Sequence, residues 1–416
     1  MTIETLKFNC FQRRVHTRGR GECSVATDAA RRTTAKKVSG QIRMTVDGRI
    51  INVKRISEPR TPIEKKFTRK TADDKGGSSA RKASVAELWM NEVAATGVRG
   101  IRKEFINDLK GYVPIGPQTA WECEKNYDKN RFEDIRLLDN TRVILRNTPD
   151  NEDYIHASYV KLDGDTVFIC AQGPMNNTAQ HFLIMIVQEG SKVIVLGHFC
   201  KKSVSVTAGS NQNLCTESVD RFLRCGIGRS TVMIPKNGSE CEDYGAVRVR
   251  ILGKPKHFLS LKKVTHTRIR ITYAGVSHET EHILYTGWPD HSVPESVTVC
   301  KEVRNIVRKY AGKKPVIVHC GAGIGRSGAY VAAEMAINRL QRNEMLVMGE
   351  LIKDLRDQRM GAIQNDQQYL FVFRMVIEVL VSEELLLKNQ QVIDFIKEYD
   401  DLIKRKRLER ARRSKT

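Results

Sequence analysis

The sequence predicts one α/β domain between two basic appendages. Beyond about residue 110, β-branched runs bounded by turn residues alternate with segments of helical length and period. The net charge of +22 is concentrated at the ends, since residues 1–85 hold 21 basic and 8 acidic side chains and residues 397–416 hold 9 and 4. Only +4 remains for residues 86–396, so the excess basicity belongs to the appendages.

The N-terminal appendage, residues 1–84, is predicted to be disordered. It has few aromatic residues, scattered Arg and Lys, and the stretch Gly76-Gly77-Ser78-Ser79 near its end. The alternation in Arg43–Val53 is compatible with a pair of strands, although no other feature of the sequence supports one. The domain is predicted to begin after Ser84, which forms a capping box with Glu87 and opens an amphipathic helix.

Strands and helices are then expected in alternation, after a second helix at Ile101–Leu109. The predicted strands are Thr166–Ala171, Lys192–Gly197, Arg268–Tyr273, His282–Thr286 and Pro315–His319. The predicted helices are Thr178–Glu189, Val297–Tyr310, Ser327–Leu340, Leu346–Asp357 and Gln367–Leu387. Residues 200–245 are expected as loops with room for a hairpin. Residues 389–416 are expected as a basic, partly helical tail, in which Lys404–Arg413 forms an amphipathic or frayed helix.

Cysteine usage and hydropathy predict a reducing, intracellular compartment. The ten cysteines include no Cys-x-x-Cys pair, which argues against zinc ribbons and thioredoxin-type redox sites. No secretory signal opens the sequence. Phe182–Val187 is too short to cross a bilayer, and four charged residues interrupt Leu370–Leu387. We therefore expect a cytoplasmic protein without a membrane span, and the basic tails are also compatible with the nucleus.

The strongest functional pattern is a loop between a buried strand, Val316–Val318, and a helix. It reads His319-Cys320-Gly321-Ala322-Gly323-Ile324-Gly325-Arg326-Ser327-Gly328. Glycines allow successive backbone N–H groups to converge on one anion, and the helix directs its N-terminus at the same point. A cysteine at the head of such a loop is expected to ionise near neutral pH. Arg326 has the planar fork that suits two phosphate oxygens.

Three other interpretations explain less of this loop. An inert core cysteine leaves the Cys-x5-Arg-Ser spacing to chance. Residues 323–328 match a dinucleotide-binding Gly-x-Gly-x-x-Gly pattern, which requires a strand after the helix, whereas Leu346–Asp357 is predicted as helix. Residues 325–329 lack the final glycine of a nucleophile elbow. A second segment, Cys225–Ser230, has only three residues between Cys and Arg, too few to wrap a phosphate in the same way.

His-Cys-x5-Arg-Ser is the signature of protein-tyrosine phosphatases, and three further segments resemble the tyrosine-specific, non-receptor branch of that family. Tyr285–Pro294 resembles its mobile acid loop, Lys129–Ile135 its substrate-recognition loop, and Gln364–Phe371 the segment that positions the hydrolytic water. The resemblance covers residues 86–385 or so, and the Trp89–Phe105 extension resembles the nematode branch. It implies a catalytic domain at 85–388 with a twisted mixed β-sheet flanked by helices.

The resemblance also implies a role for each candidate residue. Cys320 would be the nucleophile, Asp290 the general acid and then the base, and Ser327 a donor to the departing sulfur. Gln364 would hold the water, with Gln368 as its accessory. The substrate would meet the aromatic wall of Phe132, the carboxylate of Asp134 and the amides of the phosphate loop, which are those of Gly321, Ala322, Gly323, Ile324 and Gly325. Arg326 would hold the phosphate.

Several positions depart from the family pattern. Phe132 stands where Tyr is usual, Asn365 where Thr is usual, and Gly321 where Ser is common. The family hairpin that carries a Glu to brace the loop arginine has no clear match in residues 200–245. The chemistry is expected to survive, with lower catalytic efficiency.

The implied activity is hydrolysis of phosphotyrosine in proteins, without a metal or an organic cofactor. The alternative is a pseudophosphatase that binds phosphotyrosine with little turnover, and turnover of a phosphopeptide separates the two. The basic tails are expected to make weak, salt-sensitive contacts with polyanions. A nucleic-acid-binding role is a third interpretation, which the lack of interleaved aromatic residues disfavours.

Overall fold

The computed structural model describes residues 83–163, 167–197, 241–258 and 260–413, with backbone only at Leu196 and Gly197. It also gives the backbone of three short strands between residues 37 and 53. The chain divides into two compact units, Met1–Ser79 and Ala80–Thr416. Most of the N-terminal appendage, the segment Cys225–Ser230 and the loops expected at 200–240 lie outside the described residues.

The described part of the first unit is a three-stranded antiparallel sheet. It comprises β1 (Lys37–Val38), β2 (Gln41–Val46) and β3 (Arg49–Val53), in the order β1-β2-β3. Arg43 lies opposite Asn52 in the β2–β3 ladder. Here the structure differs from the predicted disorder, because the alternation in Arg43–Val53 does correspond to paired strands.

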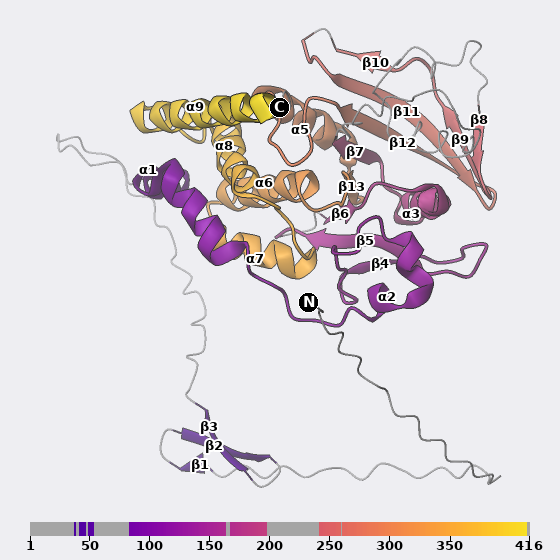
Figure 1. Cartoon of the computed structure of the whole chain (residues 1–416), viewed down its shortest axis with the longest axis horizontal. Coiled ribbons are helices and arrows are strands. Elements are labelled where there is room, and N and C mark those ends of the chain that lie inside the picture. Colours follow the sequence, from indigo (N-terminus) through magenta and orange to yellow (C-terminus); the bar gives the residue numbers. More distant parts are fainter. Residues whose placement is uncertain are drawn as a thin grey trace, which may run out of the picture. The chain divides into compact units, whose positions relative to one another are not determined.

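The second unit is built on a mixed sheet, which confirms the predicted α/β class. Its described strands are ordered β4-β5-β6-β13-β7-β12-β11-β9-β8, with β10 beside β11 (Figure 1). Neighbouring strands among β6, β13, β7 and β12 run parallel, and the remaining pairs are antiparallel. The strand bounds are β4 (Arg142–Ile144), β5 (Tyr154–Lys161), β6 (Val167–Ala171), β7 (Val193–Gly197), β8 (Cys241–Tyr244), β9 (Val247–Ile251), β10 (Lys256–His257), β11 (Val264–Tyr273), β12 (Val276–Tyr285) and β13 (Val316–His319).

Helices cover both faces of this sheet. One face packs against α3 through a core that includes Phe182, Ile186 and Ile317. The larger core on the other face joins the sheet to α1 and α5–α9. The helix bounds are α1 (Val85–Glu104), α2 (Thr119–Glu122), α3 (Ala179–Glu189), α5 (Val297–Ala311), α6 (Arg326–Gln341), α7 (Met348–Gln358), α8 (Asp366–Ser382) and α9 (Gln390–Arg413). Because α7 is a helix, the strand that a dinucleotide-binding unit requires after α6 is missing at this place.

The first helix begins as the sequence predicts. The Ser84 N–H donates to Glu87 Oε2 at 2.7 Å, and the Glu87 N–H donates to Ser84 Oγ at 3.2 Å, which is a complete capping box. Gly97 has a φ of +64° and kinks α1. The helix then continues directly into a π-helical turn, Phe105–Leu109. None of the helices in the described part of the chain is long and apolar enough to cross a bilayer.

The C-terminal segment differs most from its prediction. Residues 389–416 were expected as an appended tail, but Gln390–Arg413 is one helix, α9, that packs on α1 and α8. Its apolar positions recur every three or four residues and are buried, namely Val392, Phe395, Tyr399, Leu402 and Ile403. This stripe makes α9 part of the second compact unit, since the unit extends to Thr416.

Candidate active site

The predicted phosphate loop follows the carboxyl end of β13, near the middle of the sheet. Cys320 is 3% exposed, and α6 begins six residues later at Arg326. Gly323 has a φ of +71°, and a Cβ there would lie 2.3 Å from the Ala171 carbonyl oxygen. The loop therefore requires glycine at this position both for its backbone and for its close approach to β6. The Gly173 N–H donates to the Gly321 carbonyl at 2.9 Å and fixes the other side of the loop.

The loop favours a thiolate at Cys320. Burial by itself raises the pKa of the Cys320 thiol. The Arg326 guanidinium, the Ser327 hydroxyl and the N–H groups of Ser327 and Gly323 oppose this effect, and the net result is a lowered pKa. The side chains of Cys320, Arg326 and Ser327 thus lie together, as the sequence predicts for an anion-binding nucleophile.

The acid loop, defined as Tyr285–Pro294, lies against this site. Arg326 Nη2 is 3.1 Å from Asp290 Oδ1, and Arg326 Nη1 donates to the Trp288 carbonyl at 3.1 Å. Arg326 is buried, whereas 42% of the Asp290 side chain is exposed. The carboxylate therefore lies beside the phosphate-loop arginine and remains open to a ligand.

The acid loop has its own internal supports. Trp288 is buried, its Nε1–H donates to the Ser292 carbonyl at 2.9 Å, and its ring packs edge-on against Phe371 with centroids 4.9 Å apart. The His291 N–H donates to Asp290 Oδ1 at 3.1 Å, and His291 has a φ of +50°. The tryptophan anchors the loop, and the turn after Asp290 directs its carboxylate.

The glutamine segment closes over the start of α6. A Cβ on Gly325 would lie 2.2 Å from Gln364 Oε1 and 2.9 Å from Gln368 Nε2, so both amides lie directly on the phosphate loop. Gln368 is fully buried, and its Oε1 accepts from the Gln364 N–H at 2.9 Å. Asn365, the departure from Thr, caps α8 by accepting from the Gln368 N–H at 2.9 Å.

The predicted recognition loop is tied to the segment that follows β6. Arg131 donates to the carbonyls of Gly173 and Pro174 at 3.0 and 2.8 Å, and its N–H donates to Gln172 Oε1 at 3.0 Å. Since Gly173 also holds Gly321, this loop adjoins the phosphate loop. Phe132 is 40% exposed and Asp134 is exposed, which suits side chains that would contact a ligand from outside.

One residue of the site was missed by the sequence analysis. Arg359 is fully buried and donates to the carbonyls of Gly323 and Ala322 at 3.1 and 2.9 Å. It also bonds His156 Nδ1 at 3.0 Å and Ser158 Oγ at 3.2 Å. Burial, followed by the charge of Arg359, lowers the pKa of His156 to about 3. The imidazole therefore stays neutral, and its Nδ1 accepts the hydrogen bond from Arg359. A buried arginine without a local motif gives no signal of this role in the sequence.

The described residues offer no ready metal site. No three His, Cys, Asp or Glu side chains within them lie together so that they could hold a metal ion. Catalysis without a metal or cofactor stays a prediction. Most of residues 200–245, where the family hairpin has no clear match in the sequence, lies outside the described part.

Comparison with known proteins agrees with this geometry. A family model described as protein-tyrosine phosphatase matches residues 126–207 and 223–378, more than half of the chain. Tyrosine-protein phosphatase non-receptor type 20 of Mus musculus is 27% identical over 321 residues, 72% of this chain and 67% of that protein. Non-receptor type 4 of Mus musculus is 31% identical over 276 residues, 63% of this chain and 26% of that protein.

The match covers a small share of a further relative. Tyrosine-protein phosphatase non-receptor type 21 of Rattus norvegicus is 28% identical over 298 residues, which is 68% of this chain and 24% of that protein. The chain therefore spans about two thirds of one curated relative and about a quarter of two others. The likeness of Trp89–Phe105 to the nematode branch stays a prediction.

Proposed function

Because the chain belongs to the protein-tyrosine phosphatase family, we propose that it hydrolyses phosphotyrosine in proteins through a phosphocysteine on Cys320. The observation that carries the proposal is the grouping of a thiol of lowered pKa, a buried guanidinium and a carboxyl group, which are those of Cys320, Arg326 and Asp290. A nucleophile, an anion ligand and a proton donor in one place are the minimum set for cleavage of a phosphate monoester.

In the first step, the Cys320 thiolate attacks phosphorus. The S–P bond forms as the bond from phosphorus to the tyrosine oxygen breaks, and protonated Asp290 gives its proton to that oxygen. Arg326 and the loop N–H groups hold the charge on the phosphoryl oxygens. This division of roles agrees with the position of Asp290 beside Arg326 at the open side of the loop.

In the second step, water attacks the phosphocysteine. The Asp290 carboxylate takes the water proton, the S–P bond breaks, and the thiolate returns. Gln364 would hold this water, with Gln368 beside it, and the contact of both amides with Gly325 supports that assignment. Ser327, whose hydroxyl contributes to the lowered pKa of Cys320, would stabilise the sulfur as it leaves.

Selectivity for phosphotyrosine is proposed to come from the rim. A half-exposed Phe132 would form one wall of a slot whose depth a phenyl ring fills and a serine side chain does not. Asp134 would accept hydrogen bonds from the backbone amides of the bound protein. The cytoplasmic location and the polyanion contacts of the basic tails stay predictions. No feature of the described residues favours the pseudophosphatase alternative.

The test is turnover of a phosphotyrosine peptide by the purified full chain in the presence of EDTA. We expect release of inorganic phosphate, and no release by Cys320→Ser, which should still bind the peptide because Arg326 and the loop amides remain. A matched phosphoserine peptide should be cleaved far more slowly. Binding without turnover by the wild-type chain would establish the pseudophosphatase instead.

A further inference from the structure

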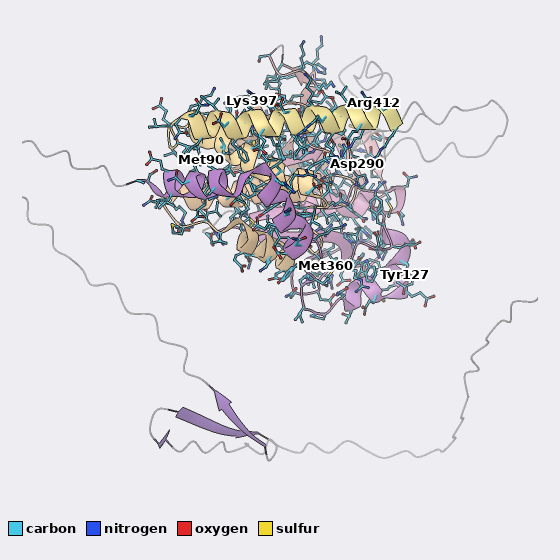
Figure 2. The ribbon with its side chains drawn as sticks, turned by 60° about the vertical axis from the view of Figure 1, so that its left-hand side comes forward. Met90, Tyr127, Asp290, Met360, Lys397 and Arg412 are labelled. Atoms are coloured by element: carbon cyan, nitrogen blue, oxygen red, sulfur yellow. The ribbon has the colours of Figure 1, made fainter. Side chains whose placement is uncertain are left out.

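The C-terminal half of α9 contacts the acid loop. The buried stripe of α9 ends at Ile403, and the helix continues through a basic segment to Arg413. Within it, Arg407 Nη2 donates to the Pro294 carbonyl at 3.0 Å, and Arg410 Nη2 donates to the His291 carbonyl at 2.9 Å. Arg407 and Arg410 are three residues apart, so they project from the same side of the helix. Figure 2 shows this end of α9, near Arg412, above Asp290.

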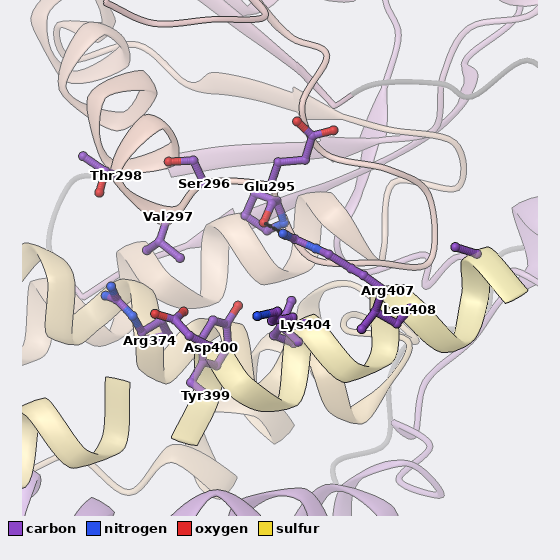
Figure 3. Close-up of a pocket in the computed structure, with 13 residues that line it drawn as sticks. Glu295, Ser296, Val297, Thr298, Arg374, Tyr399, Asp400, Lys404, Arg407 and Leu408 are labelled. Atoms are coloured by element: carbon purple, nitrogen blue, oxygen red, sulfur yellow. Dashed lines mark hydrogen bonds between the residues drawn. The ribbon is translucent and has the colours of Figure 1, made fainter. Parts of the chain in front are cut away.

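The bond from Arg407 to Pro294 crosses a hollow between the helix and the loop. A pocket of about 640 Å³ separates the end of the acid loop and the start of α5 from α8 and α9. Figure 3 shows Arg407 extended across it toward Glu295. Since the pocket takes the place of close packing here, the arginine side chains link this stretch of α9 to the acid loop.

The His291 carbonyl is a sensitive point in the acid loop. It belongs to the residue after Asp290, whose carboxylate accepts from the His291 N–H. The same carbonyl also accepts from Asn365 Nδ2 at 3.4 Å, and Arg410 Nη2 lies 3.4 Å from Gln367 Oε1. Arg410 therefore bonds both the acid loop and the helix that begins at the glutamine segment.

We propose that Arg410, supported by Arg407, is a positioning residue that holds the acid loop with Asp290 beside Arg326. The inference rests on the proposed function, because it assigns Asp290 the role of proton donor. Movement of the loop away from the site would break the bond from Arg410 to His291, so the bond stabilises the position in which Asp290 can act. The family match ends at residue 378, so α9 lies outside the matched region.

The kinetic test compares Arg410→Ala with Arg412→Ala on the full chain. Arg412 is exposed on the same turn of α9 and makes neither of the acid-loop hydrogen bonds described above, so it controls for the loss of one charge. We expect Arg410→Ala to lower kcat/KM for a phosphotyrosine peptide about three- to tenfold. We expect a much smaller effect on nitrophenyl phosphate, because that leaving group needs little protonation. Arg410→Lys should recover part of the loss.

Two further measurements separate positioning from general damage. In an Asp290→Asn background, Arg410→Ala should change kcat/KM little, because the residue acts through Asp290. Fluorescence of Trp288, isolated by comparison with Trp288→Phe, should shift to longer wavelength in Arg410→Ala and not in Arg412→Ala. This readout does not need turnover. If the wild-type chain were inactive but Arg410→Ala still shifted the Trp288 emission, the proposed function alone would be overturned. Equal kinetic loss on both substrates, or no shift of Trp288 emission, would overturn the role of Arg410.

Discussion

Arg359 donates a hydrogen bond of 3.1 Å to the carbonyl of Gly323, at the point where the phosphate loop turns with positive φ. This contact directs a loop carbonyl away from the anion site, so that the N–H groups can face the anion. The guanidinium makes four bonds in all and is fully buried. The proposed phosphate loop is therefore held from behind by a fully buried cation.

Arg359→Lys should lower both stability and activity. The ammonium keeps the charge but cannot satisfy four partners in the plane of a guanidinium. Because the group is buried, we expect a loss of unfolding free energy on the order of 3 kcal/mol and a fall in kcat/KM. Urea unfolding measures the first and phosphopeptide kinetics the second. Arg268→Lys on the exposed part of β11 is the control, and an effect at Arg359 no larger than there would contradict the bracing role.

Gly325→Ala should slow the second chemical step more than the first. Gly325 has a φ of −75°, so its backbone accepts alanine, but the new methyl group meets the Gln364 amide. The flexible glutamine moves more easily than the loop. Stopped-flow kinetics with nitrophenyl phosphate should then show a normal burst and a slower steady state. Gly111→Ala, where a Cβ meets nothing within 4 Å, should leave both phases unchanged. A lost burst would show that the loop, and not the glutamine, had been displaced.

Ser327→Ala should raise the pKa of Cys320. Burial raises this pKa, while Arg326 and then the Ser327 hydroxyl are the first groups that lower it, so loss of the hydroxyl favours the neutral thiol. The rate of alkylation by iodoacetamide follows the thiolate fraction. The variant should react more slowly than the wild type at low pH, and the two rates should converge once pH exceeds both pKa values. Identical alkylation profiles would show that the Ser327 hydroxyl does not stabilise the Cys320 thiolate.

Residues 1–83 should be dispensable for catalysis. They precede the capping box of α1, and the larger unit carries the whole candidate site. A chain that begins at Ser84 should keep kcat within a factor of a few. A tenfold fall, equivalent to about 1.4 kcal/mol in the barrier, would show that the N-terminal region belongs to the site.

Helix α1, in contrast, should be required for the fold. Trp89 is 3% exposed and stacks on Phe373, and Arg102 pairs with Asp366 at 2.6 Å. Trp89→Ala should cost about 3–5 kcal/mol of unfolding free energy. The adjacent Leu88 is 41% exposed, so Leu88→Ala should cost far less. Thermal unfolding distinguishes the two, and equal losses would mean that α1 is held mainly by its exposed face.

Local patterns predicted the parts of the site that the chain builds from consecutive residues. The strand, loop and helix around Cys320 are one continuous segment, and Trp288 and Asp290 share one loop, so spacing was informative there. Arg359 and His156 come from distant segments and meet only after folding. Arg359 has no neighbours that single it out, and no periodicity locates such a contact.

The C-terminal helix shows a second limit of sequence reasoning. Its net positive charge indicated a solvated tail, and the stripe from Val392 to Ile403 is sparse enough to pass unnoticed. Charge reports how a segment interacts with water, whereas packing depends on which neighbour offers an apolar surface. α1 and α8 offer that surface, and the arginines beyond it reach the acid loop.

The phosphocysteine is the intermediate on which the proposed mechanism depends. Acid quenching of the full chain during turnover of a phosphotyrosine peptide, followed by mass spectrometry of its peptides, tests it most directly. We predict one added phosphoryl group on the peptide that contains Cys320, more of it in Gln364→Ala, and none in Cys320→Ser. Rapid turnover without phosphate on that peptide, or phosphate on another residue, would contradict the mechanism.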